Sequence, residues 1–337
     1  MASTDEDEWN DYSNALKLSE KIEKLHKEYI KETNQLKECS GRRSNGCDQP
    51  HQNENRTGND ARNCHVIKRR MYNYDVINYY KDETILRKKI IELSDDIMTA
   101  IYHIYDIFRL CKDHVFLSFN GGKDAVVILH LFRCAYAKYI HDVKGERKRP
   151  KLIYFKDEVN EFPEVSQFLN ECVYMYDFDI TVIKGTWKSS ITQFIETYQK
   201  QHRISRIDQM KENFVDSCEF FPTIAFINGT RFNDTHNEKL QILNISSRGL
   251  PPYLYLNPVL YWTYGAIWTF ILYFKFDYCI LYNHGYSSIG SVHDTVKNEF
   301  LKCNDCYLPA YFLKNWDYER HNRVSSEENQ GGNSQQG

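Results

Sequence analysis

The sequence lacks several patterns that would place it in common functional classes. Its ten cysteines show no disulfide-like spacing and stand at positions 39, 47, 64, 111, 134, 172, 218, 279, 303 and 306. The Walker pattern G-x-x-x-x-G-K-[ST] of P-loop NTPases is absent. A formal net charge of −3 excludes a strong general attraction to nucleic acid. The first residues, MASTDEDEW, are acidic and polar, unlike a signal or transit peptide. We therefore expect a cytoplasmic protein with reduced thiols.

One long run without charge has the length of a membrane span. Residues 249–274 contain no charged residue, a length that is sufficient to cross a bilayer. Because Pro251, Pro252 and Pro258 interrupt the run, we do not expect one continuous helix. We predict a loop, a short strand and a buried helix that begins at about Thr263, with no membrane association.

What the sequence does contain is a regular alternation of strands and helices. We predict strands over residues 114–119, 151–156, 179–184 and 223–228, and helices over 82–110, 124–140, 163–176 and 187–202. Strand–helix alternation of this length indicates an α/β fold, with a doubly wound, mostly parallel sheet covered by helices on both faces.

The predicted domain spans residues 81–323. Residues 1–80 form a charged, low-complexity N-terminal extension, which we predict to be helical over 1–35 and disordered over about 40–65. Residues 324–337 are a polar tail that we also expect to be disordered. We therefore expect that removing residues 1–70 leaves the activity of the domain intact.

The segment VFLSFNGGKD, at residues 115–124, is the most informative part of the chain. An apolar strand leads into Gly121 and Gly122, which permit positive φ and a close approach of the backbone to a ligand. Lys123 adds a positive charge, and the apolar residues after Asp124 begin a helix. A strand, a glycine turn and a helix N-terminus together form an anion site from backbone N–H groups and the helix dipole.

Three polar segments follow predicted strands, at residues 120–124, 156–160 and 229–234. Ligands of such sheets bind at the carboxyl ends of the strands, near the topological switch point, so the segments predict a single site. The site lacks a convincing covalent nucleophile. It does contain cations and carboxylates suited to phosphoryl or nucleotidyl transfer, namely Lys123, Arg231, Arg320, Arg323, Asp124 and Asp234.

These motifs resemble a known enzyme family. SFNGGKD at 118–124 is similar to the pyrophosphate loop of the ATP pyrophosphatase superfamily, and Asn120 matches the spelling of the eukaryotic FAD synthases. Further segments resemble that family in the same order: NGTRFND at 228–234, LNP at 256–258, WTYGAIWTFI at 262–271, YNHGYSSIGS at 282–291, PAY at 309–311 and ERHNR at 319–323. The resemblance covers residues 114–323.

The resemblance implies an FMN adenylyltransferase, which transfers AMP from ATP to FMN with Mg²⁺ and releases pyrophosphate. No nucleic acid, membrane or protein partner is implied. The residues expected to bind the substrates are Ser118, Asn120, Gly121, Gly122, Lys123, Gly229, Arg231, Phe162, Tyr286 and Ser288. Those expected to act on the phosphates or at the reaction centre are Asp234, Arg231, Lys123, Arg320 and Arg323, and those expected to hold Mg²⁺ are Asp124 and Asp234.

Some of these residues have alternative roles. Asp124 equally suits a helix cap, and Lys123 is flexible enough to face solvent instead. Arg320 and Arg323 are spaced to share one helical face. The pair Cys303 and Cys306 has the spacing of half a zinc site, but no second ligand pair accompanies it.

The chain also departs from the family pattern, mainly on the flavin side. Phe232 and Tyr255 replace arginines, Leu250 replaces a tryptophan that contacts flavin, and Tyr261 replaces an aspartate. Two other functions therefore stay open. A sulfonucleotide reductase would need Ser at position 120 and an ECGxH motif, which is absent, and a non-catalytic nucleotide- or flavin-binding protein would need these replacements to be disabling.

Overall fold

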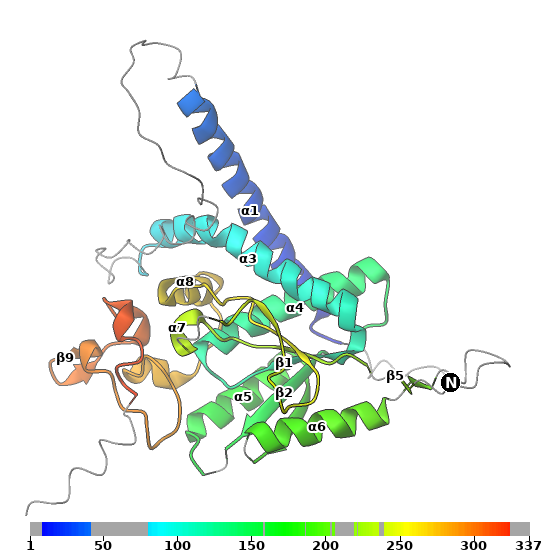
Figure 1. The fold of residues 1–337 in the computed structure, drawn as a ribbon. Coiled ribbons are helices and arrows are strands. Elements are labelled where there is room, and N and C mark those ends of the chain that lie inside the picture. Colours follow the sequence, from blue (N-terminus) through cyan, green and yellow to red (C-terminus); the bar gives the residue numbers. More distant parts are fainter. Residues whose placement is uncertain are drawn as a thin grey trace, which may run out of the picture.

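The computed structural model describes residues 9–41, 80–157, 159–185, 187–202, 204–205, 219–220, 222–235 and 239–323. At its centre lies a six-stranded sheet in the order β3-β2-β1-β6-β8-β7 (Figure 1). All neighbouring strands are parallel except β7, which runs antiparallel to β8. The strands are β1 (Val115–Ser118), β2 (Lys151–Lys156), β3 (Asp179–Lys184), β6 (Ala225–Ile227), β7 (Leu243–Ile245) and β8 (Leu254–Leu256).

Helices cover both faces of this sheet, because alternate residues of its strands point to opposite sides. In β1, Val115 and Leu117 join one hydrophobic core and Phe116 joins the other. The first core contains side chains of α3 (Glu83–Cys111), α4 (Lys123–Val143), α5 (Pro163–Met175) and α8 (Tyr264–Phe274), and the second those of α6 (Trp187–Gln201). The predicted doubly wound α/β class is therefore confirmed.

The long helix α1 and several short elements make up the rest of the described secondary structure. They are α1 (Tyr12–Gly41), η3 (Lys112–His114), β4 (Ile204–Ser205), β5 (Glu219–Phe220), α7 (Phe232–Thr235), η5 (Ile280–His284), η6 (Glu299–Leu301), β9 (Lys302–Cys303), β10 (Cys306–Tyr307), η7 (Ala310–Phe312) and η8 (Trp316–Tyr318). The C-terminal part after α8 consists mainly of these short helices and turns, and it lies beside α7 and α8 (Figure 1).

The uncharged run at 249–274 folds as expected. It contains β8 and then α8, whose N-cap is Thr263; the Thr263 hydroxyl accepts a hydrogen bond from the Ala266 N–H at 3.1 Å. Among the described residues, no helix is both long enough and apolar enough to cross a membrane.

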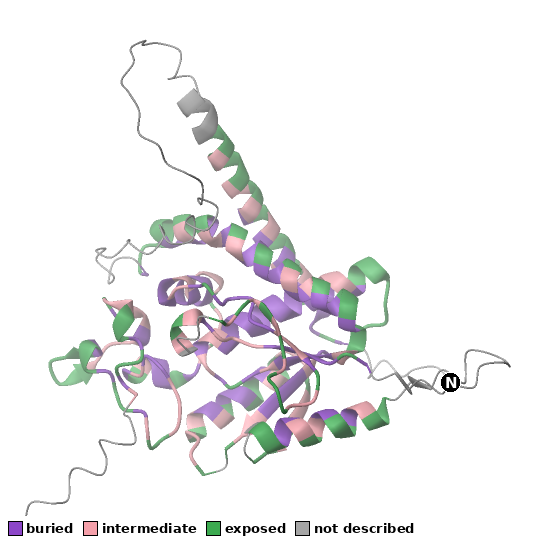
Figure 2. Ribbon diagram, viewed as in Figure 1, coloured by how far each residue is buried: buried purple, intermediate pink, exposed green. Residues whose placement is uncertain are grey.

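The N-terminal segment packs against the domain. Trp9, Ala15, Ile22 and Leu25 are buried in the first core, which also contains α3 and α4. Buried positions lie in the first half of α1 and give way to exposed ones further along the helix (Figure 2).

This packing indicates that the segment stabilises the domain, and the expectation that activity survives its removal stays a prediction. The division into extension and domain stays a prediction. Of the predicted disorder over about 40–65, residues 40 and 41 instead belong to α1; residues 42–65 and the predicted disordered tail at 324–337 lie outside the described residues.

Candidate active site

The glycine-rich turn joins β1 to α4 at the topological switch point of the sheet. The chain continues from β1 to β2 on one side, and β6 lies against β1 on the other. Gly121 has a φ of +72°, and a Cβ there would lie 2.9 Å from Val165 Cγ1, so both conformation and space require glycine. The Gly122 N–H donates to Asn120 Oδ1 at 3.0 Å, which fixes the turn just before the helix begins.

A second loop, between β6 and α7, packs directly on the start of α4. A Cβ on Gly229 would lie 3.0 Å from the carbonyl carbon of Asp124 and 3.1 Å from the Ala125 nitrogen. The absence of a side chain at Gly229 therefore lets the two loops meet. It also brings Arg231, which is fully buried, to the N-terminal end of α4.

Six charged side chains converge at this point, and we call them the charge cluster. Its members are Lys123, Asp124, Arg231, Asp234, Glu319 and Arg320. Lys123 Nζ lies 3.0 Å from Asp124 Oδ2 and 2.5 Å from Glu319 Oε1. Arg231 Nε lies 2.6 Å from Asp124 Oδ1, and Arg231 Nη2 also contacts Glu319 Oε1. Positive and negative members are equal in number, so the buried charges are compensated.

Asp234 and Arg320 form the outer side of the cluster. Arg320 Nη1 lies 3.1 Å from Asp234 Oδ1, and Arg231 Nη2 lies 3.6 Å from the same oxygen. The other carboxylate oxygen, Oδ2, accepts a hydrogen bond from the Arg231 backbone N–H at 2.9 Å. The Asp234 side chain is 19% exposed and that of Arg320 is 43% exposed, so this side of the cluster faces solvent.

Three members of the cluster, Lys123, Asp124 and Arg231, stay ionised in spite of their burial. Burial lowers the pKa of Lys123, but the carboxylates of Asp124 and Glu319 outweigh it and raise the pKa above its usual value. The same balance raises the pKa of Arg231. Burial raises the pKa of Asp124, but the positive charges of Arg231 and Lys123 prevail and lower it. Lys123, Arg231 and Asp124 are therefore charged at neutral pH.

Glu319 is a member of the cluster that we did not select from the sequence. Glu319 is only 5% exposed, and it lies 196 positions after Lys123 in the chain. A buried acid cannot be recognised from sequence when its partners are that distant. The one sequence feature that points to Glu319 is its place at the start of the segment ERHNR, in which we selected only the arginines.

Tyr282 also supports the site without having been predicted. Its hydroxyl accepts a hydrogen bond from the Lys123 backbone N–H at 2.9 Å, and its ring lies 5.8 Å from Lys123 Nζ. Burial raises the pKa of Tyr282, so the hydroxyl stays protonated. The tyrosine therefore holds the backbone of the first residue of α4.

Arg323, predicted to act with Arg320, lies apart from the cluster. Arg323 Nη2 contacts Asp294 Oδ2 at 3.3 Å, and its guanidinium covers Gly290, where a Cβ would lie 1.9 Å away. The two arginines do not share a helical face, because residues 319–322 form turns after η8 and Arg323 forms a β-bridge with Thr295. The two arginines bind different carboxylates as a result.

The remaining predicted residues lie at the start of α5, after η5 and at the end of β1. Phe162 and Tyr286 pack edge to face, with ring centroids 5.6 Å apart. The Ser288 carbonyl accepts a hydrogen bond from Asn322 Nδ2 at 2.8 Å, which ties it to the C-terminal segment. Ser118 ends β1 and is only partly buried.

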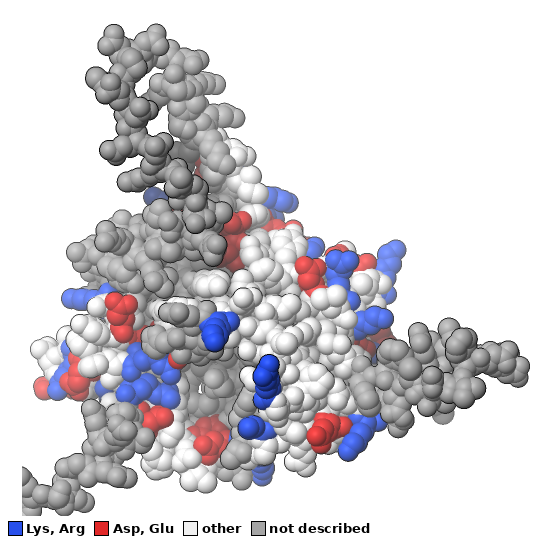
Figure 3. Space-filling view, viewed as in Figure 1, with Lys and Arg blue, Asp and Glu red and all other residues white. Residues whose placement is uncertain are grey.

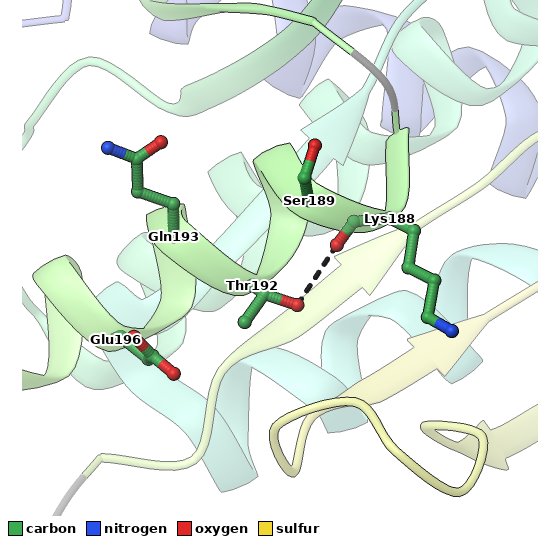
Figure 4. A pocket seen from close by; sticks show the side chains of 5 residues that line it. All are labelled: Lys188, Ser189, Thr192, Gln193 and Glu196. Atoms are coloured by element: carbon green, nitrogen blue, oxygen red, sulfur yellow. Dashed lines mark hydrogen bonds between the residues drawn. The ribbon is translucent and has the colours of Figure 1, made fainter.

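The described residues contain no group of three or more His, Cys, Asp and Glu side chains that could hold a metal ion. On the face shown in Figure 3, described charged side chains of both signs are scattered, and much of the surface carries neither. A shallow depression on α6 is lined by Lys188, Ser189, Thr192, Gln193 and Glu196 (Figure 4). None of the predicted site residues lines it.

The sequence comparisons match the part of the chain that holds the site. Residues 114–297 match the model of the phosphoadenosine phosphosulfate reductase domain. A "Probable FAD synthase" of Schizosaccharomyces pombe is 30% identical over 242 residues, which cover 70% of this chain and 82% of that protein. The "Flavin adenine dinucleotide synthase" of Saccharomyces cerevisiae is 26% identical over 224 residues, which cover 65% of this chain and 70% of that protein.

Two solved structures share the fold. Yeast FAD synthetase in complex with FAD aligns with a TM-score of 0.59 at 20% identity, over 74% of this chain and 96% of that one. Candida glabrata FMN adenylyltransferase in complex with FMN and the ATP analog AMPCPP aligns with a TM-score of 0.58 at 18% identity, over 74% and 94%. At these identities the structural likeness establishes the fold.

Proposed function

This chain belongs to the phosphoadenosine phosphosulfate reductase domain family and, within it, to the FAD synthases, and we propose that it transfers the adenylyl group of ATP to FMN. An oxygen of the FMN phosphate attacks the α-phosphorus of ATP. A new P–O bond forms, the bond from the α-phosphorus to the oxygen bridging to the β-phosphorus breaks, and the electron pair leaves with pyrophosphate. The products are FAD and pyrophosphate.

The charge cluster is the observation that carries this proposal. Lys123, Arg231 and Arg320 come together beside a glycine turn and the N-terminus of α4, a 21-residue helix. Positive side chains and a helix N-terminus stabilise the charge of phosphates without chemistry of their own. Arg231 Nη1 is buried and has no hydrogen-bond partner among the described residues, and a phosphate oxygen is the kind of acceptor that would satisfy it.

The roles of individual residues follow from their positions. Gly121 and Gly122 let ATP phosphates approach the backbone, with Asn120 shaping the turn and Gly229 keeping the two loops together. Asp234 lies at the outer, partly exposed side of the cluster, where the attacking phosphate and the α-phosphate would meet beside Arg320. We assign the reaction centre to this side.

Magnesium would enter with ATP. Without a cluster of three metal-binding side chains among the described residues, the ion would be held mainly by phosphate oxygens and by one or two carboxylates. Asp124 and Asp234 supply hard oxygen ligands that suit Mg²⁺. Asp124 pairs with the two buried cations Lys123 and Arg231, whereas Asp234 pairs with the more exposed Arg320, so Asp234 is the better candidate. The ion would neutralise charge on the departing pyrophosphate.

The flavin is proposed to lie near Phe162 and Tyr286, whose rings offer apolar surface beside the cluster. Leu250, at the position of the flavin-contacting tryptophan, packs instead against the second core, as Tyr255 does. The isoalloxazine ring therefore needs other contacts, and we propose that it packs on Phe162 and Tyr286. Arg323 would contact phosphate only after leaving Asp294. The cytoplasmic location also stays a prediction.

The test is a reaction of the purified protein with FMN, ATP and Mg²⁺, in which FAD is resolved by chromatography and pyrophosphate is measured in parallel. We expect equal amounts of both products, and none when Mg²⁺ is removed by a chelator. ATP binding without any FAD would contradict the proposal and would favour the non-catalytic nucleotide-binding function.

A further inference from the structure

One carboxylate oxygen of Glu319 contacts both buried cations of the charge cluster. Glu319 Oε1 lies 2.5 Å from Lys123 Nζ and also accepts a hydrogen bond from Arg231 Nη2. Lys123 is the first residue of α4, and Arg231 lies in the loop after β6. A single side chain from the C-terminal segment therefore connects both loops of the proposed nucleotide site.

Glu319 is held in place from its backbone as well. Its carbonyl oxygen accepts a hydrogen bond from Ser287 Oγ at 2.7 Å. Asn298 Nδ2 donates to Ser287 Oγ at 2.6 Å and to the Tyr318 carbonyl at 2.8 Å. Ser287 and Asn298 are fully buried. The carboxylate is thus fixed at the cluster by neighbours that do not themselves contact Lys123 or Arg231.

We propose that Glu319 is a positioning residue for adenylyl transfer, which holds Lys123 and Arg231 in the geometry that phosphate requires. This inference rests on the function proposed above. A lysine has a flexible stem, so a fixed partner is needed to hold its charge at one place. Removing that partner leaves both cations free to rearrange, and small displacements of positioning groups are costly in rate.

Removing Glu319 leaves two buried cations short of a partner, and breaking a buried ion pair in this way is destabilising. The Tm of each variant is therefore measured beside its turnover, and kcat is compared at a temperature where every variant is folded. The effect should be specific to the phosphate chemistry and should leave flavin affinity nearly unchanged.

The experiment compares Glu319→Gln, Glu319→Asp and the control Asp317→Asn. Asp317 is exposed and lies two residues away, so its variant makes the same charge change outside the cluster. We expect Glu319→Gln to lower kcat about 100-fold, in line with the cost of misplaced groups, while the KM for FMN changes less than about twofold. Glu319→Asp should recover at least about tenfold of that loss, because the charge is retained. Asp317→Asn should behave as the wild type.

Coupling to Lys123 provides the second measurement. If Glu319 acts through Lys123, Glu319→Gln should cost much less in the Lys123→Met background than in the wild type. The inference would be overturned if Glu319→Gln kept the wild-type kcat, or if the effects of Glu319→Gln and Lys123→Met on kcat were fully additive. Equal changes in the KM for ATP and in the KM for FMN would also overturn it. Should Glu319→Gln fail to fold, as judged by its Tm, the Asp variant and the double variant decide.

Failure of the proposed function can be recognised separately. If the wild type forms no FAD, that function fails, and Glu319 is then judged by calorimetric titration with MgATP alone. An affinity at least about tenfold weaker in Glu319→Gln than in the wild type supports positioning of the cations at the phosphates. An unchanged affinity overturns it.

Discussion

Within the charge cluster, the side chains differ in how much freedom they have. Lys123 and Arg231 each contact two carboxylates or more and are almost fully buried. Among the described carboxylates, Arg320 pairs with Asp234 alone, and its side chain is 43% exposed. Lys123 and Arg231 can therefore hold their positive charges at fixed positions, whereas the side chains of Arg320 and Asp234 can adjust to substrates. Chemistry is expected at the adjustable side.

Substitution of Asp234 is predicted to lower turnover. We expect Asp234→Asn and Asp234→Ala to reduce turnover by at least about 10²-fold, because both remove a charge from the proposed reaction centre. Asn keeps an acceptor for the Arg231 N–H, which Asp234 Oδ2 now accepts at 2.9 Å, so its Tm should stay closer to that of the wild type than the Tm of the Ala variant.

Steady-state FAD formation and thermal melting of both variants check this expectation. The exposed Asp305→Asn serves as the charge control and should retain full activity. Near-normal turnover in Asp234→Asn would remove Asp234 from the reaction centre.

The sequence indicated which of these residues belong together but not how they contact one another. Lys123, Asp124, Arg231 and Asp234 follow strands that we placed correctly, so their convergence could be expected. Glu319 could not be expected, since nothing local distinguishes a buried acid from an exposed one. Arg323 resembled Arg320 in sequence, yet its contact with Asp294 separates the two.

At the scale of elements, α4 connects the site to the N-terminal segment. Its first residue belongs to the charge cluster, while its centre carries Arg133, which pairs with Asp11 in the interior. The Arg133 guanidinium also lies over the Tyr176 ring at 4.1 Å and donates from Nη1 to His130 Nδ1 at 2.8 Å. A charged residue inside an apolar helix sequence signals a partner, but that partner is 122 positions away.

His130 provides the element-scale prediction, which concerns stability against pH. Burial, reinforced by the positive charge of Arg133, holds the pKa of His130 well below its usual value of 6.5. The unfolded chain therefore binds a proton below about pH 6.5 that the folded chain refuses, and stability decreases as pH falls through that range. The loss is at most about 1.4 kcal/mol per pH unit from this group.

Thermal melting at pH 7.5 and pH 5.5 measures this effect. We expect His130→Gln to be less stable at pH 7.5 but to lose less stability on acidification than the wild type. The control His141→Gln changes an exposed histidine and should keep the wild-type slope. Equal slopes in the wild type and His130→Gln would show that His130 does not titrate as described.

At the scale of the whole molecule, the sheet was more predictable than its surroundings. The predicted bounds of β2 and β3 match the structure, because apolar alternation and flanking helices define them locally. The edge strand β7 was missed, since its outward residues Leu243 and Ile245 are exposed and its pairing is set by β8. Likewise, helical periodicity predicted α1 but not the surface against which it packs.

Removal of residues 1–41 provides the whole-molecule prediction. The loss exposes surface buried by Trp9, Ile22 and Leu25, each worth about 1.5–3 kcal/mol. It also leaves Arg133 without Asp11, and an unpaired buried charge costs about 3–5 kcal/mol more. We expect the Tm to fall by at least about 10 °C.

Differential scanning calorimetry of the truncated chain tests this prediction. A variant without residues 1–8 keeps every contact just named and should melt as the full chain does. An unchanged Tm after removal of residues 1–41 would show that α1 contributes nothing to the stability of the domain.

Movement of the adenylyl group from ATP to FMN can be followed with isotopic labels. The full chain is incubated with FMN, Mg²⁺ and ATP carrying radioactive phosphorus at either the α or the γ position. We predict that the α label appears in FAD and the γ label in pyrophosphate, in equal amounts. Label from the γ position in the flavin product, or no α label in FAD while ATP is consumed, would contradict the account.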